Sequence, residues 1–483
     1  MDSRPTNTRP SFDRRPLALV LLERNWRWVV YAALAMLLVN STGDPWAQGL
    51  DPKAQRALAI FVVCIVLWVF NLLPLMITSI LALVLPPIMD VMPAQEAYSL
   101  FGNKVIFFLL GAFILAAALS RSGLAERITL TALRLSGGSP RRLSIGIYVT
   151  GAVLSTVMSE HAVAALLFPI VLELCRVMEL EPRRSSLGRL LFLSMAWGCI
   201  SGGVITLLGG ARGPLALGIL FQTTGTSIGF FEWVLDLLPA SLLTLGAGYG
   251  LLALFFPIEK TQAAPAEEFL RKRERKLGRL SVRELAVGAI MAATIYSWVM
   301  FEHVLGLAEV SLLAVVALFA LRLINWREVE ESVNWGVVLM YGGAVALGFT
   351  LSKSGAAHWL AESLLQGSSP SPFALIALLA VLTIFLTEAV SNAAVVSVLM
   401  PLGLALAEPL SVDPKAVTYA IAYVSGLPHV LPMGTPALAL AFSSGYLRVR
   451  HSVVAGLAFN LALLVIFLIV VKFYWPLMNM GSF

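Results

Sequence analysis

The fold of this chain is decided by residues Gly111 to Pro169, which read GAFILAAALSRSGLAERITLTALRLSGGSPRRLSIGIYVTGAVLSTVMSEHAVAALLFP. The same pattern returns at Gly343 to Pro401, at a constant offset of 232 residues and without a gap. Twenty of the 59 aligned pairs are identical, and polar positions such as Ser159 and Ser391 are among them. Chance similarity between two apolar stretches would not keep polar positions in one register. The chain therefore contains an internal repeat.

The composition is that of a membrane protein. Of the 483 residues, 58% are hydrophobic and only 13% are charged, whereas a soluble domain carries roughly 25% charged residues. A helix of about 20 apolar residues spans a bilayer, and the alternating pattern of a membrane β-barrel is absent from this sequence. We therefore expect an all-α polytopic membrane protein with about 11 transmembrane helices. Its long apolar runs are Ala57–Val69, Leu73–Val91, Phe107–Leu119, Leu187–Leu208 and Leu457–Val471.

The charges predict how the two repeats are oriented. Eight arginines lie between residues 126 and 189, but the equivalent stretch 358–421 carries only Lys415. Loops rich in Arg and Lys face the cytoplasm, so the first set of loops is predicted inside and the second outside. The two repeats are then inverted with respect to the membrane. Inverted repeats are typical of secondary transporters that work by alternating access.

This organisation predicts four segments. Residues 1–25 form a cytoplasmic tail, 26–257 the first transmembrane half with a re-entrant hairpin near 142–176, 258–284 a cytoplasmic basic linker, and 285–483 the second half with a hairpin near 372–408. The basic run Arg271–Lys276 in the linker suits anionic lipid better than nucleic acid. We expect a multi-pass protein of the cell membrane, an inner membrane in a two-membrane cell, with no cofactor and no nucleic-acid partner.

Polar residues interrupt the apolar pattern at matching places in both halves. One pair of segments is Ser155–Ala162, STVMSEHA, and Thr387–Ala394, TEAVSNAA. Each lies in an apolar stretch of about 30 residues, long enough for a helical hairpin that enters and leaves on one side but too short for two spans. Backbone polar groups at such a tip are tolerated only against protein or a water-lined cavity. Their hydroxyl and amide oxygens suit an alkali cation.

A second pair of segments predicts broken helices. Gly202–Pro214 and Ser425–Pro436 are rich in Gly and Pro, which interrupt a helix and free its carbonyl groups for an ion. The new helix that starts at Pro214 or Pro436 carries a partial positive charge at its N-terminus, which favours an anion.

These residues resemble the divalent-anion:sodium symporter family, the dicarboxylate and sulfate carriers. The resemblance rests on Phe107–Leu124, Thr387–Asn392 and the Gly434–Pro436 turn. It implies an ion-transporter fold, usually homodimeric, with an elevator mechanism and one sodium ion at each hairpin tip. The second sodium site would use Thr387, Ser391, Asn392, Gly434 and Thr435, and the first would use Ser155, Ser159, Gly209 and Gly210. The anion would lie between the tips, against Ser159, Glu160, His161, Asn392, Ala393, Thr435 and Pro436.

The sequence departs from the family pattern mainly at the first tip. Where the family has Ser-Asn-Thr, the first tip reads Ser159-Glu160-His161 and the second ends in Ala393. The first Gly-Thr-Pro-Pro-Asn turn reads GGARG and contains Arg212. Because charges within a membrane usually pair, we hypothesise that Glu160 and Arg212 pair and that Arg212 stands in for the first sodium. Two alternatives are that Glu160 and His161 carry a proton, or that the pair is a fixed bridge without a role in transport.

The expected function is secondary active transport of a small anion: a dicarboxylate, sulfate or a similar oxyanion. A cation:proton antiporter, an arsenite-type exporter and a sodium-independent anion exchanger are the alternatives. An enzyme is not expected, since a zinc-binding His-Glu-x-x-His segment is absent. Glu388 is expected to brace its hairpin, and His429 to be a packing residue.

Overall fold

The computed structural model of the chain describes residues 17–137, 139–258, 264–365, 370–478 and 480–481. Every element assigned within these ranges is a helix, in agreement with the all-α prediction. Seven helical segments of the described chain are long and apolar enough to cross a membrane. The remaining apolar helices are shorter, so the number of about 11 spans stays a prediction.

The first half of the chain forms twelve α-helices and one short 3₁₀ helix. They are α1 (Leu17–Asn40), α2 (Pro52–Val69), α3 (Leu75–Ile88), α4 (Ala94–Ser99), η1 (Leu100–Gly102), α5 (Lys104–Arg121), α6 (Leu124–Leu135), α7 (Pro140–Ser155), α8 (Glu160–Val177), α9 (Ser186–Gly202), α10 (Arg212–Thr224), α11 (Phe230–Phe255) and α12 (Ala264–Lys276).

The second half repeats this order of long, paired and broken helices. Its elements are α13 (Val282–Met300), α14 (Glu302–Leu305), α15 (Leu307–Ala320), α16 (Trp326–Ser332), α17 (Trp335–Lys353), α18 (Ala356–Leu365), α19 (Pro372–Ala389), α20 (Asn392–Ala407), α21 (Pro414–Ser425), α22 (Pro436–Ser443), α23 (Val449–Phe473) and η2 (Trp475–Met478).

Three helices begin inside segments that the sequence predicts as a tail and a linker. α1 starts at Leu17. From there to Asn40 the sequence contains no Gly or Pro that would interrupt the helix. The first 16 residues of the predicted tail lie outside the described residues. Within the predicted linker 258–284, the basic run is helical as α12 and α13 already begins at Val282, while residues 259–263 lie outside the described part.

The Ser-Pro pairs of the repeat start the hairpins. Ser139 caps α7 by accepting a hydrogen bond from a main-chain amide of the first turn, and Pro140 is the first helical residue. Ser371 and Pro372 do the same for α19. A Ser at the cap satisfies a free amide, and Pro fits the first turn because it has no amide hydrogen to satisfy. The same local chemistry thus opens both hairpins.

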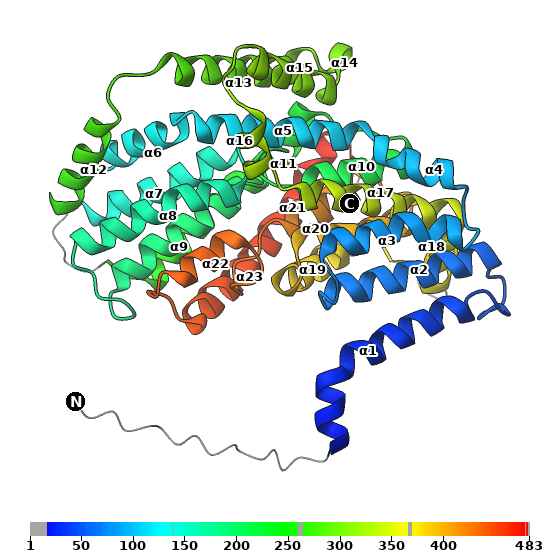
Figure 1. The fold of residues 1–483 in the computed structure, drawn as a ribbon. Coiled ribbons are helices and arrows are strands. Elements are labelled where there is room, and N and C mark those ends of the chain that lie inside the picture. Colours follow the sequence, from blue (N-terminus) through cyan, green and yellow to red (C-terminus); the bar gives the residue numbers. More distant parts are fainter. Residues whose placement is uncertain (1–16, 138, 259–263, 366–369, 479, 482–483) are drawn as a thin grey trace, which may run out of the picture.

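The helices pack as Figure 1 shows, with α13 and α15 side by side along one edge of the molecule and α15 also against α5. α17 packs on α3, and α10 lies against α5, α17 and α20. Each hairpin packs on the first part of a broken helix: α7 and α8 on α9, and α19 and α20 on α21. The fold therefore brings the two tips and the two helix breaks into one central region.

The helices α7 and α9 approach each other very closely. A Cβ atom on Gly198, in the middle of α9, would lie 2.2 Å from the carbonyl oxygen of Tyr148 in α7. The two backbones touch here, so the absence of a side chain is required by packing.

Replacing Gly198 by Ala should therefore destabilise the protein, by about 1–3 kcal/mol, as overpacking of a core does. The control is Gly250→Ala in α11, where a Cβ atom meets nothing within 4 Å. This control should be neutral or stabilising by about 0.5–1 kcal/mol, because Gly is a poor helix residue. Thermal unfolding of both purified variants in detergent measures the difference. Equal unfolding temperatures would refute the tight α7–α9 contact.

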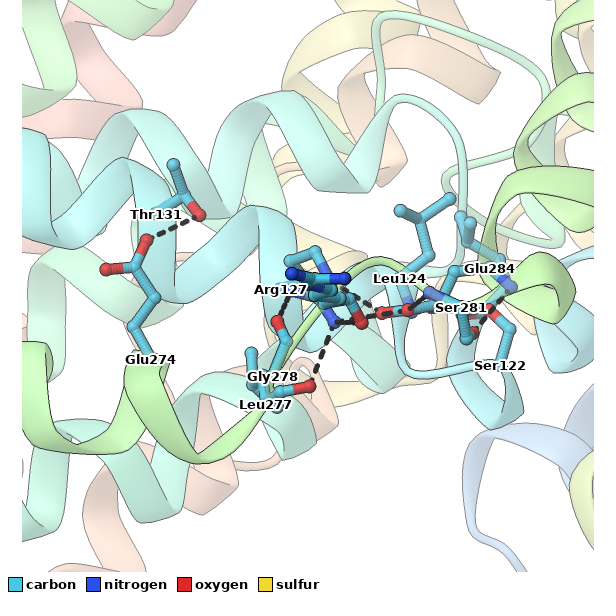
Figure 2. A network of polar contacts seen from close by, with 11 residues as sticks. Ser122, Leu124, Arg127, Thr131, Glu274, Leu277, Gly278, Ser281 and Glu284 are labelled. Atoms are coloured by element: carbon cyan, nitrogen blue, oxygen red, sulfur yellow. Dashed lines mark hydrogen bonds and ion pairs between the residues drawn. The ribbon is translucent and has the colours of Figure 1, made fainter.

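A network of polar contacts joins α6 to α12 and to the start of α13, as Figure 2 shows. Arg127 of α6 binds both carboxylate oxygens of Glu284, at 2.7 and 3.1 Å, and also donates to the carbonyl of Gly278 at 3.0 Å. A second ion pair joins Glu126 and Arg273 at 3.1 Å. The chain segment between α11 and α13 is therefore tied to α6.

Candidate functional site

The tip of the first hairpin, residues 156–159, is held against the loop between α9 and α10. The amide of Glu160 donates to the carbonyl of Gly209 at 3.0 Å, and the hydroxyl of Thr206 donates to the carbonyl of Thr156 at 2.6 Å. Ser159 is the N-cap of α8. The loop thus satisfies backbone groups that the hairpin turn leaves free, as burial at membrane depth requires.

The tip of the second hairpin, Val390 and Ser391, has the same construction. Ser391 caps α20 with its hydroxyl. The hydroxyl of Thr387, near the end of α19, donates to the carbonyl of Ser425 at 2.6 Å, where α21 breaks. Both tips are therefore joined to the break of a neighbouring helix.

Oxygen atoms gather at the second tip around Asn392. Its side-chain oxygen lies 3.0 Å from the hydroxyl of Thr387 and faces the carbonyl oxygens of Gly434 and Ser425. Rotating the amide by 180° would let its nitrogen donate to these carbonyls, at 3.2 and 3.3 Å. Because the rotated amide gives both carbonyls a donor, the groups that this tip offers a cation are the two carbonyl oxygens and the hydroxyl of Thr387, with the amide oxygen as a further ligand when the amide turns toward the ion. Hard cations take oxygen ligands of this kind.

The first tip carries opposite charges in place of such a cluster. Nη1 of Arg212, the first residue of α10, donates to Oε2 of Glu160 at 3.2 Å. The two side chains are 5% and 0% exposed. A Cβ atom on Gly426 would lie 2.0 Å from Nε of Arg212, so only glycine leaves room for the arginine across the break between α21 and α22. The hypothesis from sequence thus names residues that the structure does bring together.

Glu160 and Arg212 also reach beyond their own half. The hydroxyl of Thr435, at the start of α22, donates to Oε1 of Glu160 at 3.2 Å. Nη2 of Arg212 has no hydrogen-bond partner within the described residues. The carboxylate of Glu160 is therefore shared between the two broken helices, and one donor of Arg212 is left for a further acceptor.

The other residues expected at the site divide into accessible and buried ones. His161 is the most accessible, with 47% of its side chain exposed, and its Nδ1 lies 3.6 Å from Oε1 of Glu160. Pro436 is exposed, whereas Ser155 is fully buried at the end of α7. The half-buried ones are Ser159, Ser391, Asn392, Ala393 and Gly210, and those buried are Glu160, Gly209, Thr387, Gly434 and Thr435. Glu160 is therefore enclosed by protein, whereas His161 and Pro436 lie at the protein surface.

Glu388, near the end of α19, supports the site by binding the loop between α21 and α22. Its two carboxylate oxygens accept hydrogen bonds from the amides of His429, Val430 and Leu431, at 2.9 to 3.2 Å, and from the side chain of Asn460 at 3.0 Å. The loop between α21 and α22 is thereby fixed in an irregular conformation.

His429 and Asn460 complete this support. The imidazole of His429 is fully buried and packs between Trp197 and Phe459, the packing role expected for it. Asn460 was not among the residues expected at the site. It could have been found as a lone amide in the apolar run of α23, because polar residues within membrane helices usually bind a neighbouring helix.

Comparisons with known proteins decide the family. A profile of the sodium:sulfate symporter transmembrane region matches residues 23–480. The chain belongs to this family. The resemblance seen in the sequence is confirmed, and the symporter-family chain is a multi-pass membrane transporter and not an enzyme.

Curated relatives of this symporter-family chain include sodium-dependent dicarboxylate transporters. That of Staphylococcus saprophyticus is 26% identical over 455 residues, covering 89% of this chain and 88% of the relative. That of Staphylococcus aureus is 27% identical over 470 residues, covering 92% and 89%.

Two solved structures share the fold. The YdaH transporter of Alcanivorax borkumensis matches with a TM-score of 0.52 and 16% identity, over 80% of this chain and 90% of that one. The MtrF protein of Neisseria gonorrhoeae, described among antimetabolite efflux pumps, matches with a TM-score of 0.56 and 14% identity, over 86% and 94%. At these identities the likeness concerns the fold alone.

Proposed function

We propose that this protein carries a small anion together with sodium, and that sodium binds at the second hairpin tip. The oxygen cluster around Asn392, Thr387, Ser425 and Gly434 is the observation that carries the proposal. The sodium-dependent dicarboxylate transporters among the relatives support it. The anion is a dicarboxylate, sulfate or a similar oxyanion.

The first tip needs no sodium in this proposal. The guanidinium of Arg212 supplies the positive charge there, and Glu160 compensates it. The carbonyl of Gly209, expected as a sodium ligand, already accepts the amide of Glu160. The starts of α10 and α22 meet in the same region, and their partial positive charges favour the anion. The transporter then couples each cycle to fewer sodium ions than a relative with two sodium sites.

Transport would proceed by an elevator-type movement of the two hairpins and their broken helices. The predicted inverted repeat, with eight arginines in residues 126–189 and none in the equivalent stretch 358–421, supports alternating access. A homodimer in the cell membrane, with its N-terminus and the 258–284 linker in the cytoplasm, follows from the same family pattern and from the basic residues of the linker.

Uptake of labelled succinate and labelled sulfate into proteoliposomes tests this function. An inward sodium gradient should stimulate uptake of one of them, whereas a potassium gradient of equal size should not. Uptake that ignores sodium but accelerates when the vesicles contain the same anion would show a sodium-independent exchanger instead. Failure of both anions would exclude succinate and sulfate as substrates and would favour another oxyanion or the antiporter.

One observation favours a second candidate, in which a proton replaces the missing sodium. His161 is accessible and its Nδ1 lies 3.6 Å from the buried carboxylate of Glu160. Histidine changes charge near neutral pH, so this pair could take up a proton from solution and place it beside Arg212. A pH gradient that drives anion uptake without sodium in the wild type but not in His161→Gln would establish this coupling to protons.

A further inference from the structure

We propose that Glu160 of the first tip sets the sodium affinity of the second tip by positioning the hydroxyl of Thr435. The inference rests on the proposed sodium site, and it assigns to the buried charge pair a role in ion coupling between the two halves. Glu160 is then a positioning residue that never touches the ion.

The position of Thr435 in α22 is the first observation. Thr435 is the N-cap of this helix, with extended backbone angles of −152° and 146°, yet its side chain caps no amide. The serines at the two hairpin tips, Ser159 and Ser391, do cap their helices. A Thr at this position ordinarily accepts a hydrogen bond from the first turn. Its hydroxyl hydrogen is directed to Oε1 of Glu160 at 3.2 Å instead.

The geometry of this contact decides what the oxygen of Thr435 can do. A hydroxyl has one hydrogen and two lone pairs. Because Glu160 receives the hydrogen, the lone pairs point away from the carboxylate and remain available to a cation. Thr435 directly follows Gly434, whose carbonyl belongs to the oxygen cluster around Asn392. A carboxylate acceptor holds the hydroxyl more firmly than a neutral one, since charge-assisted hydrogen bonds are stronger.

Glu160 is itself held in place by its surroundings. Its amide donates to Gly209, its Oε2 accepts from Arg212, and its side chain is 0% exposed. A Cβ atom on Gly203 would lie 2.7 Å from Oε2, so the surroundings also limit its movement. Movement of the first tip, or loss of its charge, is therefore transmitted to Thr435 through one hydrogen bond.

The test is the sodium dependence of thermal stability, measured on the full-length purified protein with potassium as the control salt. This readout requires no knowledge of the anion. Thr435→Val removes the hydroxyl at nearly constant shape and should raise the half-saturating sodium concentration about tenfold, the factor expected for one lost charge-assisted contact. Thr435→Ser keeps the hydroxyl and should raise the half-saturating sodium concentration by a smaller factor. The matched control is Thr350→Val, because among the described residues the hydroxyl of Thr350 bonds only to its own helix, at the carbonyl of Ala346.

Two double variants separate positioning from charge. Glu160→Met with Arg212→Met removes the acceptor of Thr435 without leaving an unpaired charge, and should weaken sodium binding as much as Thr435→Val. Glu160→Gln with Arg212→Met restores an acceptor without a charge and should recover part of that loss. Adding Thr435→Val to the Met–Met variant should weaken binding by much less than the product of the two separate losses, since part of the loss on removing the hydroxyl has already occurred when its acceptor is absent.

Each outcome decides a different question. If the wild-type protein is not stabilised by sodium over potassium, the proposed sodium site is wrong and this inference falls with it. If wild type responds to sodium but the Met–Met variant keeps its half-saturating concentration, only the link through Glu160 is overturned. Multiplicative losses in the triple variant would likewise show that Glu160 and Thr435 act separately.

Discussion

Arg212→Gln should destabilise the protein by about 3–5 kcal/mol, the cost of leaving a buried charge without its partner. The side chain of Glu160 is 0% exposed. Without Arg212, the polar partners left to its carboxylate among the described residues are the hydroxyl of Thr435 and, at 3.6 Å, Nδ1 of His161. Glu160→Gln should cost a similar amount, because it strands the guanidinium. Urea or thermal unfolding in detergent, with size-exclusion profiles as the check on folding, measures both.

The double variant Glu160→Gln with Arg212→Gln is the decisive comparison. Removing both charges relieves the desolvation of the pair, so the double variant should be more stable than either single one. It should nonetheless lose anion uptake if Arg212 supplies the positive charge that the proposal assigns to it at the first tip. Full uptake by the double variant would show that the pair is a fixed bridge with no role in transport.

Asn392→Ala should abolish sodium stimulation of uptake. The side-chain oxygen of Asn392 lies 3.0 Å from the hydroxyl of Thr387 and faces two carbonyls of the second-tip cluster. Losing a central ligand should weaken sodium binding about 100-fold, since hydrogen bonds and ligands to charged groups contribute about 1.5–3 kcal/mol each. The control is Ser397→Ala in the same helix, whose hydroxyl bonds only to the carbonyl of Ala393 at 2.8 Å.

Asn392→Asp distinguishes the two orientations of this amide. If a cation lies among the oxygens, aspartate keeps the ligand and adds a favourable charge, so the variant should be stabilised strongly by sodium. If the amide nitrogen instead donates to Ser425 and Gly434, aspartate places a carboxylate against two carbonyl oxygens and should destabilise the fold whether sodium is present or not. Thermal unfolding in sodium and in potassium separates these results.

Much of the helical structure could be anticipated from local features of the chain. The apolar runs predict helices that lie in a membrane, and the Ser-Pro pairs at Ser139 and Ser371 mark where α7 and α19 begin. Gly and Pro in the segments after Gly202 and Ser425 mark the breaks of α9 and α21. These features act within a few residues of one another, through capping and backbone conformation, so a linear sequence displays them.

Residues of the site were less predictable where their partners are distant. Glu388 is a single carboxylate in an apolar helix, and the sequence alone does not show that it binds three consecutive amides near His429, some 41 to 43 residues away. The role of Asn460 could not be predicted for the same reason. Its acceptor is the carboxylate of Glu388, 72 residues distant.

The sequence by itself determined that the chain is an all-helical membrane transporter with an internal repeat, because apolar length, polar interruptions and their constant spacing are properties of the linear order. Only the tertiary structure decided which polar groups meet. Glu160 reaches Arg212 across 52 residues and Thr435 across 275, and in doing so joins the two halves of the repeat. Contacts over such separations depend on how the helices pack, since a buried charge takes whatever partner the packed backbones place within reach.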